Sequence, residues 1–443
     1  ARMSVFKAYD IRGLHGSEID TDLAHKIGLA YAAEVKPQRV LVGHDMRPVA
    51  PRMRDALVAG LRAAGVDVVD CGLCSTPMHS FGVGHGDFDG GIMVTASHNP
   101  AEYIGFKLCR KQAVPLSGEQ GIGAMEARIR RGDLPEAGYE GALRSGDFTE
   151  AYVDMVVGEA NFGRKLKIVA DAGNGMGGFE FSLVAPRLDL ELVPLYFTPD
   201  GTFPNHEANP LNVATLEELR ARVLQEKADF GVAFDGDADR AAFIDEKGDV
   251  VTNDLATALM AIDILEREKG PVVYDVRCSR VVDEEIREHG GMPIKSRVGH
   301  SFMKAAMRER RCVFGGEYSG HYYFPRNFNT ESASLAVVAM GNIVSRAETG
   351  LAGLLKPLRR YRQTGEINFR VRDKEAKMRE LEQAFPDADI DRLDGVTISY
   401  PGWWCNVRPS NTEPYLRLNL EACDPEDFKK ARQKVFAILG EPV

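Results

Sequence analysis

Three aspartates at alternate positions stand out in the segment FGVAFDGDADRAAFID. Asp235, Asp237 and Asp239 lie between two short apolar runs, Phe230–Phe234 and residues 241–244, which read as strands. Carboxylates crowded this closely repel one another unless a cation lies among them. Oxygen-only ligands suit Mg²⁺, which commonly takes carboxylates together with a phosphate oxygen. We therefore predict that this loop binds Mg²⁺.

Two alternatives explain the same loop. An EF-hand would use Glu246 at its twelfth position, but Arg240 occupies the sixth position, where an EF-hand has glycine, and strands rather than helices flank the loop. An acidic, solvated turn without a metal is the second alternative. Gly236 and Ala238 give the loop little other side-chain function, which favours the Mg²⁺ site.

Ser97 is a second candidate for chemistry, in the segment VTASHNPAEYIGFK. The glycines of a nucleophile elbow are absent around it, and no nearby pattern marks a base partner. Read from its neighbours alone, Ser97 is either an ordinary turn residue or a reactive serine whose partners lie elsewhere in the chain.

Two further loops carry groups that suit a sugar phosphate. In GGEYSGHYYFP, the carboxylate of Glu317 lies close in sequence to the hydroxyl of Ser319, and the two could accept and donate hydrogen bonds to a sugar diol. NVRPSNTEP combines one guanidinium with three small polar side chains around a proline turn, a set that suits a phosphate. Its members are Arg408, Ser410, Asn411 and Thr412. Plain turns are the alternative for both loops.

Two motifs suggest different chemistry. GNGMGG, at residues 173–178, fits a dinucleotide fingerprint that Asp200 would complete, but the helix after it is short, and glycines at such a turn often serve the backbone alone. Cys71 and Cys74 match the spacing of a redox motif, and no second pair completes a zinc site.

The elements that must position these residues follow a repeated pattern. Three segments each run from an apolar strand, through a polar loop, into an amphipathic helix and a second apolar strand; the first strands end near Asp45, at Asp171 and at Asp275. This alternation indicates βαβ units. After Pro357 the order becomes strand–helix, strands and a final helix. We therefore expect three related α/β domains with mixed sheets and a smaller C-terminal α+β domain, at residues 1–145, 146–248, 249–360 and 361–443.

One helix of the second unit has a clear predicted start. Thr215 precedes the apolar positions Leu216, Leu219 and Val223, and Glu218 stands three residues after it. This spacing predicts that Thr215 begins the helix and that Glu218 completes a capping box.

The composition is that of a globular protein too long for one core. The chain has 443 residues, of which 44% are hydrophobic and 27% charged. Its net charge of −10 argues against a nucleic-acid partner, although a few arginines could still bind a small anion. No apolar run approaches the roughly 18 residues of a membrane span, so we expect no membrane partner and a cytoplasmic location. The seven scattered cysteines predict no disulfide framework.

Taken in order, five motifs resemble the α-D-phosphohexomutase family over essentially the whole chain. They are YDIRG, TASHNP, DGDADR, GEYSGH and RPSNTEP. The likeness looks closest to the bacterial members that act on phosphomannose and phosphoglucose. The family's architecture, four domains around a central cleft, agrees with the organisation described above.

The resemblance implies a role for each motif. Ser97 would carry a transferable phosphoryl group and would complete the Mg²⁺ shell of the three aspartates. Lys107 and His300 would transfer protons or contact substrate, and Arg240 would serve catalysis from the cleft wall. Arg277 stands where bacterial members often have lysine, which differs in reach and geometry. The residues implied in substrate binding are Tyr9, Arg12, His98, Arg277, Glu317, Ser319, Arg408, Ser410, Asn411 and Thr412.

The implied reaction is a reversible phosphoryl transfer between C1 and C6 of an α-hexose phosphate. Mannose or glucose 1-phosphate would become the 6-phosphate through a phosphoserine and a bound glucose or mannose 1,6-bisphosphate. Phosphoglucosamine mutase is the alternative within the family; a phosphoserine-dependent sugar phosphatase and a non-catalytic sugar-phosphate sensor are alternatives from other classes. The expected partner is a small sugar phosphate, bound by a monomer or weak homodimer. GNGMGG becomes a domain-opening turn, and Cys71 and Cys74 receive no redox role.

Overall fold

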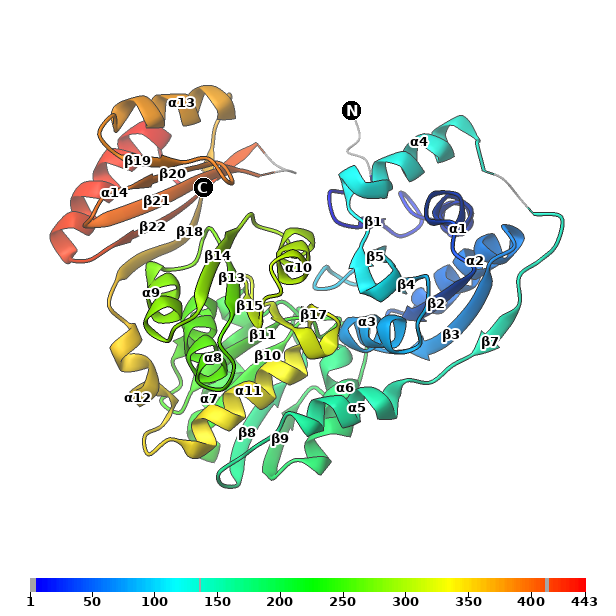
Figure 1. Ribbon diagram of the computed structural model, residues 1–443, viewed down its shortest axis with the longest axis horizontal. Coiled ribbons are helices and arrows are strands. Elements are labelled where there is room, and N and C mark those ends of the chain that lie inside the picture. The colour runs from blue at the N-terminus through cyan, green and yellow to red at the C-terminus, as the bar shows by residue number, and fades with distance from the viewer. Residues whose placement is uncertain (1–4, 135–136, 411–413) are drawn as a thin grey trace.

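The computed structural model describes residues 5–134, 137–410 and 414–443, which fold into four sheets with their helices (Figure 1). In Figure 1 the first sheet lies on the right, the second and third lie below, and the fourth lies at the upper left. The C-terminal sheet is antiparallel throughout and carries α13 (Lys374–Ala384) and α14 (Pro425–Leu439). None of the helices in the described ranges has the length and hydropathy that a membrane crossing requires.

The first three sheets share one strand pattern. In each, a first strand pairs in parallel with a second and a third strand on its two sides, and the third strand then pairs antiparallel with the next strand of the chain. In sheet order, the strands of the first sheet are β1 (Ile11–Leu14), β5 (Tyr103–Arg110), β4 (Gly90–Val94), β2 (Arg39–His44), β3 (Asp67–Leu73) and β7 (Leu143–Ser145), with β6 (Val114–Pro115) beside β5. Those of the second are β12 (Val250–Val251), β11 (Ala241–Asp245), β10 (Phe230–Phe234), β8 (Leu166–Asp171) and β9 (Leu190–Leu195).

The third sheet repeats the pattern of the second, and the fourth departs from it. The third consists of β14 (Met292–Ser296), β13 (Pro271–Asp275), β15 (Phe314–Gly316), β16 (Tyr322–Phe324) and β17 (Thr330–Glu331). The fourth consists of β18 (Arg362–Arg370), β22 (Tyr415–Ala422), β21 (Trp403–Pro409), β20 (Val396–Ser399) and β19 (Asp389–Asp391). The expected change of fold class after the third unit is therefore present.

In each α/β sheet, the aspartate at the end of the first strand accepts the same kind of backbone hydrogen bond. The backbone N–H two residues further along donates to the aspartate: Arg47 N to Asp45 at 3.1 Å, and Arg277 N to Asp275 at 2.8 Å. Asp171 accepts in the same way from the N–H of Gly173, at 2.8 Å. All three carboxylates are buried, so these bonds fix the path of the chain as it leaves the strand.

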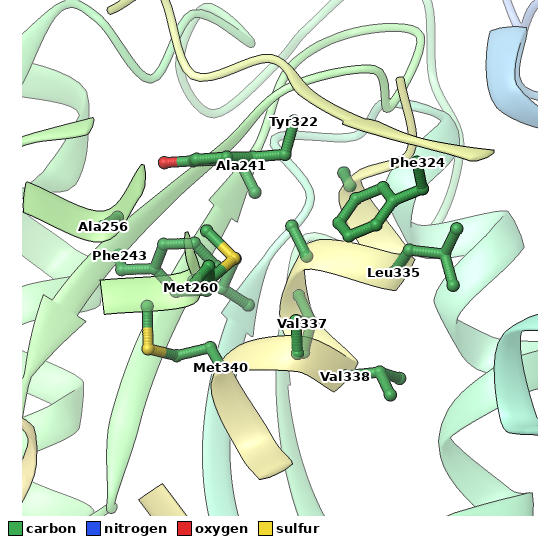
Figure 2. Packing of buried hydrophobic residues seen from close by; sticks show 14 of the residues in the cluster. Ala241, Phe243, Ala256, Met260, Tyr322, Phe324, Leu335, Val337, Val338 and Met340 are labelled. Carbon is green, nitrogen blue, oxygen red and sulfur yellow. The ribbon is translucent and has the colours of Figure 1, made fainter. Parts of the chain in front are cut away.

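The second and third domains share one hydrophobic core. Helix α11 (Ala333–Arg346) is buried on nearly all sides, as expected for a helix that is apolar all round. Figure 2 shows its side chains between β11, β16 and helix α8 (Asn253–Arg267). The same apolar cluster reaches α3 (Thr76–His85) of the first domain, whereas the fourth domain has a core of its own. One apolar cluster therefore joins the second and third domains to part of the first, which also has a separate core.

The remaining helices flank the three α/β sheets. They are α1 (Thr21–Val35), α2 (Ala50–Ala63), α4 (Gly123–Arg131), α5 (Thr149–Gly158), α6 (Met176–Val184), α7 (Glu217–Glu226), α9 (Arg280–Glu288), α10 (His300–Glu309) and α12 (Leu351–Leu355). The predicted domain limits fall in or near connections between sheets, but β12 extends the second sheet past residue 248. The domain limits stay predictions to within a few residues.

The predicted capping box at Thr215 is wrong. Residues Val213–Leu216 form a 3₁₀ turn, and α7 begins only at Glu217 without a side-chain cap. The Asn212 side chain accepts from the N–H of Ala214 instead, and the carboxylate of Glu218 accepts from the hydroxyl of Tyr196. A stronger capping residue just upstream and a tertiary partner therefore override the local spacing.

Candidate active site

The three candidate loops of the α/β domains occupy equivalent places. Residues 95–102 lie between β4 and β5, residues 235–240 between β10 and β11, and residues 317–321 between β15 and β16. Each loop thus follows the third parallel strand and precedes the antiparallel one. In α/β sheets the carboxyl ends of parallel strands are the edge at which ligands bind. The repeated fold therefore brings the three motifs to corresponding positions.

A cleft of about 970 Å³ joins these loops to the fourth domain. Its walls come from all four domains, which agrees with the expected central cleft. The predicted site residues on its lining are Tyr9, His98, Arg240, Arg277, His300, Glu317, Ser319, Arg408 and Ser410. Asn411 and Thr412 lie outside the described residues.

Ser97 and the acidic loop meet behind this lining. Ser97 Oγ donates to Asp235 Oδ2 at 3.0 Å and lies 3.4 Å from Nδ1 of His98. The backbone of Ser97 has φ +51°, in the left-handed region that a serine rarely adopts. Such strain persists only where the surroundings determine the conformation, and it is common at functional sites.

The side chain that determines the Ser97 loop is Arg47, which sequence reasoning missed. Arg47 is 1% exposed, and its guanidinium donates four hydrogen bonds of 2.7–3.0 Å to backbone carbonyls of the loop. The acceptors are Ser97, Asn99, Pro100 and Tyr103. The predicted residue Arg12 adds a bond from its guanidinium to Asn99 Oδ1 at 2.5 Å.

A close approach of two backbones explains Gly236. A Cβ at this position would lie 2.2 Å from the carbonyl oxygen of Ser97. Only glycine therefore lets the acidic loop of the second domain lie against the serine loop of the first.

The acidic loop has the donor set of a cation site. Carboxylate oxygens of Asp235, Asp237 and Asp239 lie within 4.8 Å of one another, and all three residues are at most 2% exposed. Oδ1 of Asp237 is buried and has no hydrogen-bond partner in the described part of the chain. The Lys107 ammonium contacts Asp237 and lies 2.6 Å from Asp239. An unpartnered carboxylate oxygen beside two further carboxylates fits a divalent cation such as Mg²⁺.

The electrostatics of the loop follow from burial and crowding. Burial raises the pKa of Asp235 well above its ordinary value, and the charges of Asp239 and Asp237 add to this. Burial also acts to raise the pKa of Asp239, but the neighbouring Lys107 and His321 outweigh it and hold the pKa well below. Burial acts to lower the pKa of Lys107, but the charges of Asp237 and Asp239 outweigh it and raise the pKa. Lys107 is therefore a firmly held cation in this arrangement.

Thr76 of the first domain also holds the acidic loop and was not predicted. Its hydroxyl donates to Asp237 Oδ2 at 2.5 Å, and its backbone N–H donates to the carbonyl of Asp237 at 3.1 Å. Thr76 opens α3, and the hydroxyl of Ser75 caps that helix by accepting from Met78 N at 3.2 Å. The start of one helix thus fixes the orientation of a predicted metal ligand.

The loop of the third domain is built around Glu317. Its carboxylate accepts from Gly299 N at 3.0 Å, from the hydroxyl of Tyr323 at 2.9 Å and from Nδ1 of His321 at 3.0 Å. Burial acts to raise the pKa of Glu317, but the bond to His321 and the charge of Arg277 outweigh it and hold the pKa well below its usual range. Glu317 is therefore an ionised acceptor on the cleft wall.

His321 joins this loop to the acidic loop and is a third residue that sequence reasoning missed. Its Nε2 lies 3.3 Å from Asp239 Oδ1, while its Nδ1 lies 2.8 Å from the hydroxyl of Ser319. Burial acts to lower the pKa of His321, but the charge of Asp239 outweighs it and raises the pKa to about 9. A backbone bridge between Arg240 and His321 ties the two loops together.

At the far end of the cleft, Arg408 and Ser410 lie on the fourth domain. Arg408 is 8% exposed, and its Nε is buried with no hydrogen-bond partner among the described residues. Its Nη2 donates to Glu366 Oε2 at 2.7 Å, and Arg417 lies 3.5 Å from Oε1 of the same carboxylate. A buried guanidinium with an unused donor on a cleft wall is suited to an anion.

Arg277 connects the third domain with the fourth. Its guanidinium donates to Asp275 at 2.9 and 3.0 Å and lies 3.5 Å from Glu317 and 3.7 Å from Glu366. Burial acts to lower the pKa of Arg277, but the charge of Asp275 outweighs it and raises the pKa. Three carboxylates already balance this charge, so the arrangement favours contact with sugar hydroxyls over capture of a phosphate.

His300 and Tyr9 face each other where the first and third domains meet. Their ring centroids are 5.5 Å apart, and the Tyr9 hydroxyl donates to the carbonyl of Val298 at 3.1 Å. Burial and the charges of Lys304 and Lys107 hold the pKa of His300 well below its ordinary value. Its Nδ1 is buried and has no hydrogen-bond partner in the described ranges. His300 is therefore a neutral imidazole with a free ring nitrogen.

Comparison with known proteins agrees with this geometry. Family models described as phosphoglucomutase/phosphomannomutase alpha/beta/alpha domains I, II and III match residues 3–135, 150–248 and 252–361, and the model of the C-terminal domain matches residues 366–438. The chain belongs to the phosphoglucomutase/phosphomannomutase family. It is a phosphohexomutase, as the five motifs predict, and the predicted fold class is confirmed.

The alignments with known relatives cover nearly the full length of this phosphohexomutase. A phosphomannomutase of Methanocaldococcus jannaschii is 37% identical over 99% of this chain and 98% of its own length. A phosphomannomutase of Escherichia coli K12 is 35% identical over 99% of both chains. The solved structure of a phosphoglucomutase/phosphomannomutase family protein from Burkholderia thailandensis is 33% identical, with a TM-score of 0.91 over 99% of this chain and 98% of that one.

The GNGMGG motif of this phosphohexomutase supports the backbone. A Cβ at Gly178 would lie 2.1 Å from the carbonyl oxygen of Phe197, and a Cβ at Gly175 would lie 2.8 Å from that of Gly236. Met176 N donates to Gly236 O at 2.9 Å. These glycines therefore let helix α6 lie against the acidic loop, as expected for a domain-opening turn.

Proposed function

We propose that this phosphohexomutase interconverts the 1- and 6-phosphates of mannose or glucose through a phosphoserine at Ser97. The observation that carries the proposal is the 3.0 Å bond from Ser97 Oγ to Asp235, which joins the serine loop to the acidic loop. A phosphoryl group on this oxygen would lie among the three carboxylates, where only a cation makes its charge tolerable. The strained, tightly held loop supplies the positioning that phosphoryl transfer mainly needs.

Asp235, Asp237 and Asp239 would hold Mg²⁺ together with an oxygen of the Ser97 phosphate. When bound, Mg²⁺ would neutralise charge on the transferring phosphoryl group. Lys107, whose ammonium already contacts Asp237 and Asp239, would supply a second positive charge beside it. The unpartnered oxygen of Asp237 supports this assignment.

The non-reacting phosphate would bind the fourth domain. Arg408 would use its free Nε and its Nη groups, and Ser410, Asn411 and Thr412 would add donors around the same turn. The placement of Arg408 and Ser410 on the cleft lining supports this role. The substrate would then span the cleft, with one phosphate held here and the other end facing Ser97.

The sugar would bind along the third domain. Glu317 and Ser319 would contact its hydroxyls, and Arg277 would shape this part of the pocket through its ion pairs. Tyr9, His98 and Arg240 would complete the lining near the reacting phosphate. Arg12 lies behind the cleft lining and would position the serine loop through its hydrogen bond to Asn99.

The sugar hydroxyl must lose a proton when it accepts the phosphoryl group, and His300 is the better candidate for the base. It is neutral and has a free ring nitrogen, whereas Lys107 keeps its proton between two aspartates. The phosphoryl group would pass from Ser97 to the sugar, giving a 1,6-bisphosphate. That intermediate would turn over in the cleft and return its other phosphate to Ser97.

A mutase assay primed with glucose or mannose 1,6-bisphosphate tests the proposal. Mannose, glucose and glucosamine 1-phosphates are supplied in parallel, and both hexose 6-phosphate and inorganic phosphate are measured. We expect turnover of mannose and glucose phosphates with little release of phosphate, in a monomer or weak homodimer by sedimentation. Preference for the glucosamine substrate, release of phosphate without isomerisation, or binding without turnover would each contradict it.

A further inference from the structure

The two cysteines of the CGLC segment lie side by side in the fold. Their Sγ atoms are 3.7 Å apart, although only Gly72 and Leu73 separate them in the chain. A Cβ at Gly43 would lie 2.6 Å from the sulfur of Cys74 and 2.9 Å from that of Cys71. The pair thus sits over a glycine backbone, and any side chain at position 43 would force the sulfurs to move.

A bulge in β3 turns Cys71 toward its partner. Val42 of β2 pairs with Asp70, and the next residue, Gly43, pairs with Gly72, so Cys71 is the extra residue. Bulges of this kind redirect a side chain. The sulfur of Cys71 therefore points to Cys74, beyond the end of the strand.

The two thiols differ in accessibility. Cys71 is partly exposed, whereas Cys74 is 4% exposed. The hydrogen bond with Cys71 and burial together raise the pKa of the Cys74 thiol well above its ordinary value. An oxidant from solution would therefore meet Cys71 first, and Cys74 would act as the second, resolving thiol.

Cys74 is coupled to the acidic loop by the two residues that follow it. Ser75 caps α3, and its hydroxyl also donates to the buried carboxylate of Glu180. Thr76 then holds Asp237 through both its hydroxyl and its backbone N–H. A displacement of Cys74 is therefore passed directly to a proposed metal ligand.

We propose that Cys71 and Cys74 form a reversible disulfide with peroxide and that this bond loosens the metal-binding loop. Hydrogen peroxide oxidises the Cys71 thiol to a sulfenic acid, and one water leaves. The Cys74 sulfur then attacks the Cys71 sulfur, the S–S bond forms, and a second water carries away the hydroxyl and the remaining thiol proton. The dithiol loses two electrons and the peroxide gains them; a dithiol reductant restores the pair.

The geometry accounts for the effect on the loop. The sulfurs must approach from 3.7 Å to about 2.0 Å for the bond to form. The residues on either side of Cys71 are paired with β2, which limits how far the strand can shift, so Cys74 and the start of α3 take up part of this movement. Loss of a group that orients a metal ligand typically weakens metal binding by about tenfold or more.

The experiment uses the full chain carrying Cys423→Ser, which removes the exposed thiol of the fourth domain. The protein is treated with hydrogen peroxide, its free thiols are alkylated, and the peptides of a digest are analysed by mass spectrometry. Mg²⁺ binding is followed by thermal stabilisation in the absence of substrate. We expect the peptide containing residues 71–74 to lose two hydrogens and escape alkylation, and the Mg²⁺ concentration for half-maximal stabilisation to rise about tenfold until dithiothreitol restores it.

Two variants in the same background separate the disulfide from general oxidation. Cys71→Ser should keep the Mg²⁺ response of the reduced protein under peroxide, and Cys74→Ser should accumulate a sulfenic acid that a dimedone reagent labels. Two outcomes would overturn the proposal: no disulfide at 71–74 when Cys423 of the unsubstituted chain is oxidised, or a complete disulfide with an unchanged Mg²⁺ response. These readouts need no turnover, so failure of the proposed sugar chemistry would leave them interpretable.

Discussion

Ser97 Oγ and Asp235 Oδ2 are 3.0 Å apart, although 138 positions separate the two residues in the chain. The contact exists because the first and second domains place equivalent loops at the same edge of equivalent sheets. It brings the proposed phosphoryl carrier to the proposed metal ligands.

Arg47 should control the rate without touching the substrate. Arg47→Lys keeps a positive charge, but one ammonium cannot replace four directed bonds to the serine loop. A misplacement of about 1 Å at a reacting group can lower the rate about 100-fold, so we expect kcat to fall by that order with little change in KM. Steady-state kinetics test this, with Arg52→Lys, an exposed position on helix α2 of the same domain, as the control. Wild-type kcat in Arg47→Lys would contradict the positioning role.

Asp235 should illustrate a conflict between stability and function. Burial and repulsion raise the pKa of this carboxylate, so Asp235→Asn removes an unfavourable charge from the metal-free protein. We expect the melting temperature without metal to stay the same or rise, stabilisation by Mg²⁺ to disappear, and mutase activity to fall at least about 100-fold. Thermal unfolding with EDTA and with Mg²⁺ tests both halves. If Mg²⁺ stabilises Asp235→Asn as much as the wild type, Asp235 is not a ligand of the metal.

Arg408 should act mainly on substrate binding. Arg408→Lys loses the planar fork that suits a phosphate, and hydrogen bonds to charged groups contribute about 1.5–3 kcal/mol each. We expect KM for the hexose 1-phosphate to rise about 10- to 100-fold, with a smaller change in kcat. Arg432→Lys, on the outer helix of the same domain, is the matched control. A fall in kcat at constant KM would place the phosphate elsewhere.

His206 should give the second domain a pH-dependent stability. Its Nε2 lies 2.9 Å from Asp171 Oδ2, and this hydrogen bond raises the pKa of His206 from 6.5 to about 8. Because the folded-state pKa is the higher one, the extra stability is complete below pH 6.5 and is lost as the pH rises through about 8. Because His206 is partly exposed, we expect the free energy of unfolding to fall by about 1 kcal/mol over this pH range.

Denaturant unfolding between pH 6 and pH 9 measures this loss. His206→Asn should be less stable than the wild type at pH 6 and nearly equal to it at pH 9. A wild-type stability that stays level or rises across this range relative to His206→Asn would contradict the assignment.

The sequence predicts much of the fold because its signals are periodic and local. The strands predicted to end near Asp45, at Asp171 and at Asp275 could be read from apolar runs followed by a polar loop, and in the structure they end at His44, Asp171 and Asp275. The predicted helix start at Thr215 is wrong because the Asn212 side chain caps a turn just upstream, by accepting from Ala214 N, and the Glu218 carboxylate that a capping box would use accepts from Tyr196. The short β12 could not be assigned, since two valines become a strand only through their pairing with β11.

The site residues likewise fall into those that the sequence identifies and those that only the folded structure identifies. Most of the site residues within the five motifs could be named in advance. Many of them line the cleft, Ser97, Asp235 and Asp239 contact lining residues, and Arg12 and Asp237 lie behind the lining. Arg47 and Thr76 lie outside the motifs, and His321 received no role although it ends the GEYSGH motif. Each acts through contacts that the fold creates, on loop carbonyls or on aspartates of another domain. One signal was present: Asp45-x-Arg47 repeats the spacing of Asp275-x-Arg277 at the end of an equivalent strand. The second repeat has Gly173 at this place, so a comparison of the first repeat with the third is what points to Arg47.

The most direct test of the central claim follows a labelled phosphoryl group. The enzyme is mixed with hexose 1,6-bisphosphate labelled in its phosphates, quenched within one turnover, digested and mapped, and a second sample is chased with unlabelled mannose 1-phosphate. We predict label on the peptide containing Ser97, its transfer to hexose phosphate during the chase, and no label or turnover in Ser97→Ala. Turnover of Ser97→Ala at the wild-type rate, or label that never appears on Ser97, would contradict the account.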